Sequence, residues 1–277
     1  EIVLLVVGAV IFVISFVLPA KKEDSGEVLN LAKEEIRDLI SNEMSQIKGQ
    51  VDDTVDEAIA EAEHYVHEVA SGKQAFSLTS CCPSWSVLAK NYFPETIDKI
   101  SNALTPMVAT ARIMKEEHPD ASVVFIGPCA SKKLEASRRT IRSEVDFVIT
   151  FEELMGMFDA KGIVLEEVVA EDEMDDATAA GRGYGVAGGV ASAIEACVKE
   201  YYPDVEVHIE HAESLAECKK MLLLAKAGKK NGCLIEGMAC PGGCIAGAGT
   251  NIAIPTAMKS VAGFQADSKE KLPKKED

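Results

Sequence analysis

The chain has 277 residues, 47% of them apolar, which is enough for one large domain or two smaller ones with a substantial core. Its formal net charge of −17 argues against nucleic acid as a partner, because phosphate binding needs a basic surface. The 8 cysteines are too sparse for a small disulfide-linked fold, and their clustered spacing favours metal or redox chemistry in a reducing compartment.

The N-terminal segment differs from the rest of the chain. Residues 2–18 carry no charge and approach the length of about 20 residues that a membrane-spanning helix needs. Lys21 and Lys22 follow directly, and by the positive-inside rule they place the remainder of the chain in the cytoplasm. We therefore expect a transmembrane anchor and a cell-membrane location. A cleaved signal peptide is the alternative for the segment, and a cytoplasmic protein is the alternative for the location.

The next segment predicts a short linker followed by a long amphipathic helix. Apolar residues recur at a spacing of eleven, at Ile36, Ile47, Ala58 and Val69, which keeps them on one face of a nearly straight helix. The other faces are heavily acidic. We expect a solvated stalk or a self-associating helix.

From Phe76 onward, short apolar runs alternate with helical patterns. This alternation is typical of an α/β domain with mainly parallel sheets flanked by helices. The expected strands are Phe76–Thr79, Ser122–Ile126, Asp146–Thr150, Gly162–Val168, Val205–His211 and Gly232–Glu236. Thr150 with Glu153, and Ser214 with Glu217, have the spacing of helix capping boxes. The expected division is an anchor over 1–20, a linker and helix over 21–60, the α/β domain over 61–258 and a charged tail over 259–277.

Three cysteine motifs each follow an expected strand, where the sites of parallel sheets gather. They are TSCCPSW from Thr79, GPCASKKLE from Gly127 and EGMACPGGCIAGAG from Glu236. The side chains of adjacent Cys81 and Cys82 diverge, so we expect one to bind metal and the other to remain a free thiol. One cysteine from each of the first two motifs and two from the third make four thiolates, the usual complement of a [4Fe–4S] cluster.

Together these motifs resemble the signature motifs of the [FeFe]-hydrogenase catalytic domain, over roughly residues 61–255. The resemblance implies an iron hydrogenase-like fold and reversible H2 oxidation and proton reduction at an H-cluster. In that cofactor a [4Fe–4S] cluster is linked to a two-iron subcluster with CO, cyanide and azadithiolate ligands. The implied cubane ligands are Cys82, Cys129, Cys240 and Cys244, and Cys244 would also bridge to the two-iron subcluster.

The resemblance also assigns roles around the two-iron subcluster. Cys81 matches the thiol that passes protons to the bridgehead amine, and Lys132 matches the lysine that donates to a cyanide. Met238 matches the methionine beside the bridging CO. The remaining residues implied to line the pocket are Thr105, Pro106 and Tyr184.

The family's proton relay would continue through Glu61 and Ser101. His64 occupies the second acidic position of the relay, and Glu68 replaces the arginine that usually follows. Because histidine conducts protons near neutral pH, the path would be altered rather than lost. The alternative is that Glu61 and His64 are exposed helix residues.

Two departures from the family concern electron supply and enclosure. No C-x2-C-x2-C run is present, so electrons would reach the cubane directly from a separate carrier such as ferredoxin. The two-iron subcluster would be inserted by hydrogenase maturation proteins. The region that helps to enclose this subcluster in the family is replaced here, so we expect one open wall. Three interpretations stay open: a membrane-tethered minimal enzyme, a subunit completed by a partner, and a fragment or fusion that lacks activity.

The remaining candidates have simpler interpretations. Cys197, Cys218 and Cys233 match no ligand position and are expected to be buried thiols. The basic run from Lys132 to Arg142 is either a solvated helix face or a docking patch for an acidic carrier. Two other functions remain possible, namely a membrane-tethered sensor of H2 or redox state and a non-catalytic iron–sulfur module of the assembly type. Retention of the proton-relay thiol and the cyanide donor argues against the module.

Overall fold

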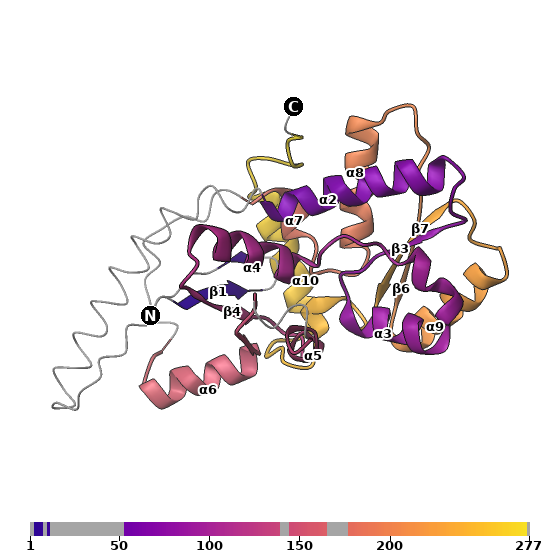
Figure 1. The fold of residues 1–277 in the computed structure, drawn as a ribbon. Coiled ribbons are helices and arrows are strands. Elements are labelled where there is room, and N and C mark those ends of the chain that lie inside the picture. Colours follow the sequence, from indigo (N-terminus) through magenta and orange to yellow (C-terminus); the bar gives the residue numbers. More distant parts are fainter. Residues whose placement is uncertain (1–2, 8–9, 12–52, 139–143, 165–176, 276–277) are drawn as a thin grey trace.

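The protein is represented by a computed structural model that describes residues 3–7, 10–11, 53–138, 144–164 and 177–275. Two sheets organise these residues, one on the left of the view in Figure 1 and one on the right. The first has the strand order β2-β1-β4-β5 and the second β3-β7-β6. Every pairing is parallel except that of β1 with β2. The expected α/β class with mainly parallel sheets is therefore confirmed.

The N-terminal apolar run contains strands where a membrane helix was predicted. Val3–Val7 form β1, which pairs in parallel with β4 (Ser122–Ile126), and Val10–Ile11 return antiparallel as β2. Strands of parallel sheets also read as near-continuous apolar runs, so the run alone did not distinguish the two structures. Among the described residues, no helix is long and apolar enough to cross a membrane. The predicted transmembrane anchor and cell-membrane location are therefore wrong.

The predicted linker and long helix fall mostly on residues 12–52, which lie outside the described residues. The described part of this segment begins with α2 (Asp53–His64), which continues into the π-helix η2 (Tyr65–Ala70). Ala58 and Val69, eleven residues apart, are both buried in the main core. The regular spacing therefore marks a face that packs on the domain over this part of the helix.

The second sheet carries the larger core. Its strands are β3 (Ser77–Leu78), β6 (His208–Glu213) and β7 (Cys233–Met238). The helices whose residues share this core are α2, α3 (Pro83–Tyr92), α8 (Gly189–Tyr201) and α9 (Leu215–Lys226). A smaller core lies between β4 and α4 (Pro106–Glu117). Each sheet therefore has its own packed layer of helices, and the three cysteine motifs lie at strand ends of both sheets.

Most expected strands are found close to their predicted positions. Ser122–Ile126 matches β4 residue for residue, and β5 occupies Phe147–Ile149. Gly162, where a strand was expected to begin, is instead the left-handed C-cap of α6 (Phe151–Lys161). The expected strand residues beyond 164 lie outside the described residues. The Thr150 capping box is present with both of its hydrogen bonds. The other short elements are η3 (Pro94–Lys99), α5 (Ser131–Ala136), α7 (Ala179–Arg182) and η5 (Cys244–Ala246).

The C-terminal residues pack back onto the domain. Helix α10 (Ile254–Ala266) runs through the boundary expected at 258 and contacts α7. After it, the carbonyl of Glu270 accepts the N–H of Ala179 at 2.9 Å. Lys275 then forms an ion pair with Glu63 of α2 at 2.7 Å. The charged residues beyond α10 therefore lie against α7 and α2.

Candidate metal centre

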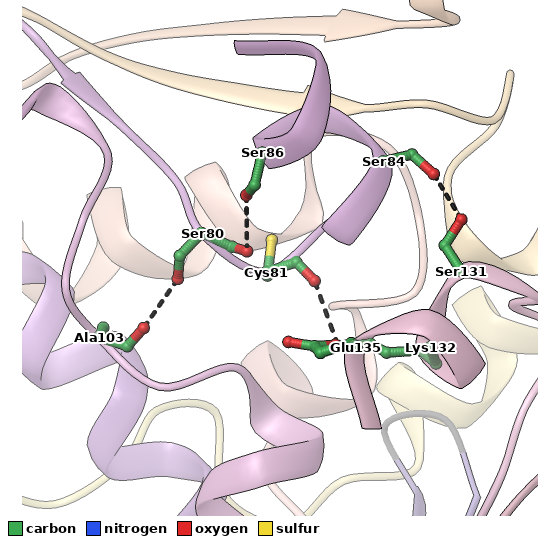
Figure 2. Close-up of polar contacts among 8 residues, drawn as sticks. All are labelled: Ser80, Cys81, Ser84, Ser86, Ala103, Ser131, Lys132 and Glu135. Atoms are coloured by element: carbon green, nitrogen blue, oxygen red, sulfur yellow. Dashed lines mark hydrogen bonds and ion pairs between the residues drawn. The ribbon is translucent and has the colours of Figure 1, made fainter. Parts of the chain in front are cut away.

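The first two cysteine motifs contact each other directly. Lys132 donates from Nζ to the carbonyl oxygen of Cys81 at 3.3 Å, and the hydroxyls of Ser84 and Ser131 are hydrogen-bonded (Figure 2). The Ser80 hydroxyl donates to the carbonyl of Ala103 at 2.9 Å, which fixes the loop between β3 and α3 from its other side. These contacts hold the loop after β3 against the start of α5.

The third motif is held on the second by glycines. The N–H of Gly249 donates to the carbonyl of Pro128 at 2.9 Å. A Cβ on Gly247 would lie 2.3 Å from that same carbonyl oxygen, so a residue without a side chain is required for the approach. Two further backbone bonds of 3.1 Å, from Ala187 to Gly242 and from Ile245 to Gly185, join the motif to the loop before α8.

The four cysteines predicted as cubane ligands come together. Burial raises the pKa of Cys82, Cys240 and Cys244, the last to about 12, and the neighbouring thiol of Cys129 raises each further. None of the 8 cysteines, all of which lie in the described part of the chain, forms a disulfide. Four thiols gathered from three strand ends fit the donor set of a [4Fe–4S] cluster, in which each thiolate binds a different iron. Metal binding here must displace thiol protons.

The described residues contain no group of three His, Cys, Asp or Glu placed to hold a single metal ion.

Cys81 and Cys82 have different surroundings. Cys82 is buried at the N-cap of α3, where the backbone N–H groups of Trp85 and Ala239 favour its thiolate. Cys81 instead lines a cavity of ≈450 Å³. Of the two neighbours, Cys81 lines the cavity and Cys82 does not.

This cavity brings together most of the residues expected around a two-iron group. Its wall includes Cys81, Lys132 and Met238, with Cys129 and Cys244 on the same surface. Pro106 and Tyr184 also line it. Thr105 is buried next to Pro106 at the N-cap of α4 but is not among the lining residues.

Sequence reasoning did not find the other wall of the cavity. Ala257, Ser260, Val261 and Phe264 of α10 line it. Arg182 also lines it, donates to the carbonyl of Phe264 at 2.7 Å and places its guanidinium 3.9 Å from the centre of the Phe264 ring. These residues belong to no motif. The apolar repeat of α10 indicates an amphipathic helix but not which surface it packs on.

Lys132 forms a buried ion pair with Glu135, whose role sequence reasoning left unassigned. Nζ lies 2.7 Å from the carboxylate, and the two side chains are 9% and 3% exposed. Burial alone would lower the pKa of Lys132, but the charge of Glu135 and the thiols of Cys244 and Cys81 together raise it. The ammonium therefore stays charged at the cavity wall.

Glu61 and Ser101 also meet. Both are buried, and burial raises the pKa of Glu61 to about 7 although a hydrogen bond from the Ser101 side chain opposes the shift. His64 lies one turn further along α2, and within the described part of the chain its Nε2 is buried without a hydrogen-bond partner. Glu68 is on the surface, 3.4 Å from Lys73. The alternative that Glu61 is an exposed helix residue does not hold.

Two of the remaining cysteines are fully buried, as expected. Cys197 and Cys218 lie in the main core, whereas Cys233 is partly exposed. Of the basic run, Lys133 pairs with Glu153 at 2.7 Å. Arg139 and Arg142 lie outside the described residues, so the docking patch stays a prediction.

Four thiols that converge at the ends of parallel strands in an α/β protein have the donor set of an iron–sulfur cluster. The family model described as "Iron only hydrogenase large subunit, C-terminal domain" matches residues 48–248. The chain therefore belongs to this family of hydrogenase-like iron–sulfur oxidoreductases, and the resemblance seen in the motifs is confirmed.

The relatives that the chain resembles include a hydrogenase and an iron–sulfur cluster assembly factor. Iron hydrogenase 1 of Clostridium pasteurianum is 29% identical over 230 residues, covering 68% of this chain and 40% of that protein. The cytosolic Fe-S cluster assembly factor NAR1 of Kluyveromyces lactis is 34% identical over 94 residues, covering 34% of this chain and 20% of that protein. The chain spans half or less of the length of the hydrogenases that it matches.

The fold agrees with solved structures. An [FeFe]-hydrogenase HydA1 from Chlamydomonas reinhardtii superposes with a TM-score of 0.65 at 20% identity, over 81% of this chain and 75% of that one. At this identity the likeness concerns the fold.

Proposed function

We propose that this chain interconverts H2 with protons and electrons. Cys82, Cys129, Cys240 and Cys244 would hold a [4Fe–4S] cluster, and Cys244 would extend it to a two-iron group in the cavity. The observation that carries the proposal is that Cys81, Lys132 and Met238 line one cavity with two of the cluster cysteines. Once bound, the two-iron group would supply the metal at which H2 is split or formed.

Lys132 is suited to hold an anionic ligand in this cavity. An ammonium has three N–H donors, of which Glu135 and the carbonyl of Cys81 take two. The third can donate to a cyanide in the cavity. Because the cavity wall is mostly apolar, such a charge-assisted bond is stronger than it would be in water.

Cys81 and Glu61 are the residues that would transfer the proton. Cys81 lines the cavity and would move the proton there, and the loop that carries it follows β3. The backbone N–H of Ser101 donates at 2.8 Å to the carbonyl of Leu78, which lies in β3. The same strand therefore positions both Ser101 and the loop that carries Cys81. Glu61, with a pKa of about 7 beside Ser101, can both accept and release a proton near neutral pH. His64 would extend the route along α2 in place of a carboxylate.

Electrons would come from a separate ferredoxin-like carrier. Electrons could enter near Cys240, because this cysteine is partly exposed and the next residue, Pro241, is exposed. Maturation proteins would deliver the two-iron group. Ile252, which lines the cavity, and Ile254 and Met258 of α10 are exposed apolar residues. Such residues suit a partner subunit or a second copy of the chain.

The proposal is tested by anoxic reconstitution with iron and sulfide, followed by a synthetic two-iron complex. Infrared bands of CO and cyanide, together with H2 evolution from reduced methyl viologen, are the expected result. A chain that binds the cubane but never shows these bands is not a hydrogenase.

A non-catalytic iron–sulfur protein is the second candidate function, and the match to NAR1 favours it. The same experiment separates the two functions. An assembly-type protein would give the electron paramagnetic resonance signal of a reduced cubane and no CO or cyanide bands. Retention of Cys81, Lys132 and Met238 around one cavity supports the enzyme.

A further inference from the structure

Glu213 makes a direct contact with the loop from Cys240 to Cys244. It is the last residue of β6 and pairs in register with Met238, two residues before that loop. Its carboxylate accepts the backbone N–H of Gly242, in the middle of the loop. The carbonyl of Gly242 in turn accepts the N–H of Ala187 at 3.1 Å. Gly242 is therefore held at both of its backbone polar groups.

The residue after Glu213 is strained. Among the non-glycine residues that the structure describes, Ser214 alone has a positive φ, with φ 72° and ψ 148°. This region is occupied almost only by glycine, and such strain persists where the surrounding contacts fix it. Ser214 accepts the N–H of Glu217 at 3.3 Å and so caps α9. The turn from β6 into α9 thus fixes the backbone beside Glu213.

The position of this carboxylate has an electrostatic consequence. A negative charge beside an iron–sulfur cluster disfavours the addition of an electron. The carboxylate also occupies the N–H of Gly242, which therefore cannot donate to a cluster sulfur, and hydrogen bonds to cluster sulfurs raise reduction potentials. Both effects act in the same direction, towards a more negative potential.

We propose that Glu213 is a positioning residue that orients the Cys240–Cys244 loop and lowers the reduction potential of the cluster held there. The inference rests on the cubane of the proposed function and does not require the two-iron group. It assigns a role to a residue outside the three cysteine motifs.

The test uses the full chain reconstituted anoxically with iron and sulfide only. Glu213→Gln keeps an oxygen acceptor and removes the charge, whereas Glu213→Ala removes both. Glu210→Gln is the matched control, because Glu210 lies on the same strand but pairs with Lys230. The midpoint potential is measured by titration with dithionite, followed by electron paramagnetic resonance, and iron retention is measured against a chelator.

We expect the midpoint potential to become more positive in the Gln variant and more positive still in the Ala variant. The Ala variant should also lose iron to the chelator faster than the wild type, and Glu210→Gln should change neither property. If Glu213→Gln loses its cluster, Glu213→Asp should retain it at a potential close to that of the wild type. Loss in both variants would mean that the residue only supports the fold.

The outcomes separate this inference from the proposed function. A wild-type chain that binds no cluster overturns both. A wild-type chain that binds the cubane, with variants of unchanged potential, overturns the role of Glu213 alone.

Discussion

Lys132 and Glu135 form an ion pair inside the protein, with Nζ 2.7 Å from Oε2 and both side chains almost fully buried. They are three residues apart on α5, so the pair forms within one helix. The carboxylate keeps the ammonium charged at the cavity wall and, with Cys81, fixes its direction.

Removing the carboxylate should destabilise the protein. Glu135→Gln leaves the ammonium buried without its counter-charge, which costs about 3–5 kcal/mol. Urea unfolding of the metal-free protein at pH 7 measures the change. The control is Glu195→Gln on the surface of α8, where the pair with Lys199 is exposed and is worth at most about 0.5 kcal/mol. Equal effects of the two substitutions would show that the buried pair contributes no more than a surface pair.

The two adjacent cysteines should differ in their effect on iron binding. Cys82→Ser removes a proposed ligand, so the reconstituted protein should hold less iron than the wild type. Cys81→Ser should retain full iron and the visible absorption of the cluster but lose most H2 turnover once the two-iron complex is added. Cys197→Ala, a buried cysteine in the core, should change neither property. Loss of iron in Cys81→Ser would reverse the assignment of the pair.

Gly237 is required by the packing of Trp85. A Cβ at this position would lie 2.1 Å from a ring carbon of Trp85, which is fully buried and donates to the carbonyl of Thr79 at 3.1 Å. Gly237→Ala should therefore destabilise by roughly 1–3 kcal/mol or more.

Gly156 provides the matched case. No atom lies within 4 Å of a Cβ added there, in the middle of α6, so Gly156→Ala should stabilise by up to about 1 kcal/mol. Thermal unfolding of both variants tests the pair, and a stabilising Gly237→Ala would contradict the packing described here.

Glu61 should make stability depend on pH. Burial raises its pKa from 4.5 to about 7, against a hydrogen bond from Ser101 that lowers it. Between these values the folded protein holds a proton that the unfolded chain has lost. Protonation of Glu61 therefore makes its full contribution to the free energy of unfolding below pH 4.5. This contribution, about 3 kcal/mol in total, is lost as the pH rises to 7.

Glu61→Gln has no such proton to lose. The unfolding free energy of the variant relative to that of the wild type should therefore rise from pH 5 to pH 7 and level off by pH 8. Urea titrations at these values measure it. A difference that stays constant with pH would mean that Glu61 titrates normally.

The sequence predicted elements with local signals and missed those fixed by distant contacts. Ser122–Ile126 and the Thr150 cap could be predicted because an apolar run and a capping pair are written in adjacent residues. The N-terminal run was misassigned because an apolar stretch suits a parallel strand as well as a membrane helix. The pairing of β1 with β4 depends on residues more than a hundred positions away.

The candidate site likewise has features that local sequence signals predict and features that depend on distant contacts. Motif spacing predicted which cysteines meet, because each motif follows its own strand. No local pattern predicted that α10 would line the cavity or that Glu213 would reach Gly242, since both contacts arise from tertiary packing.

Helix α10 has a consequence for the order in which the protein is made. It follows all three cysteine motifs along the chain, yet it supplies one wall of the cavity that they share. During synthesis the cysteine loops emerge first, and the cavity keeps an open side until α10 has left the ribosome and docked on α7. Until α10 docks, the side of the cavity that this helix covers is open to a bulky group.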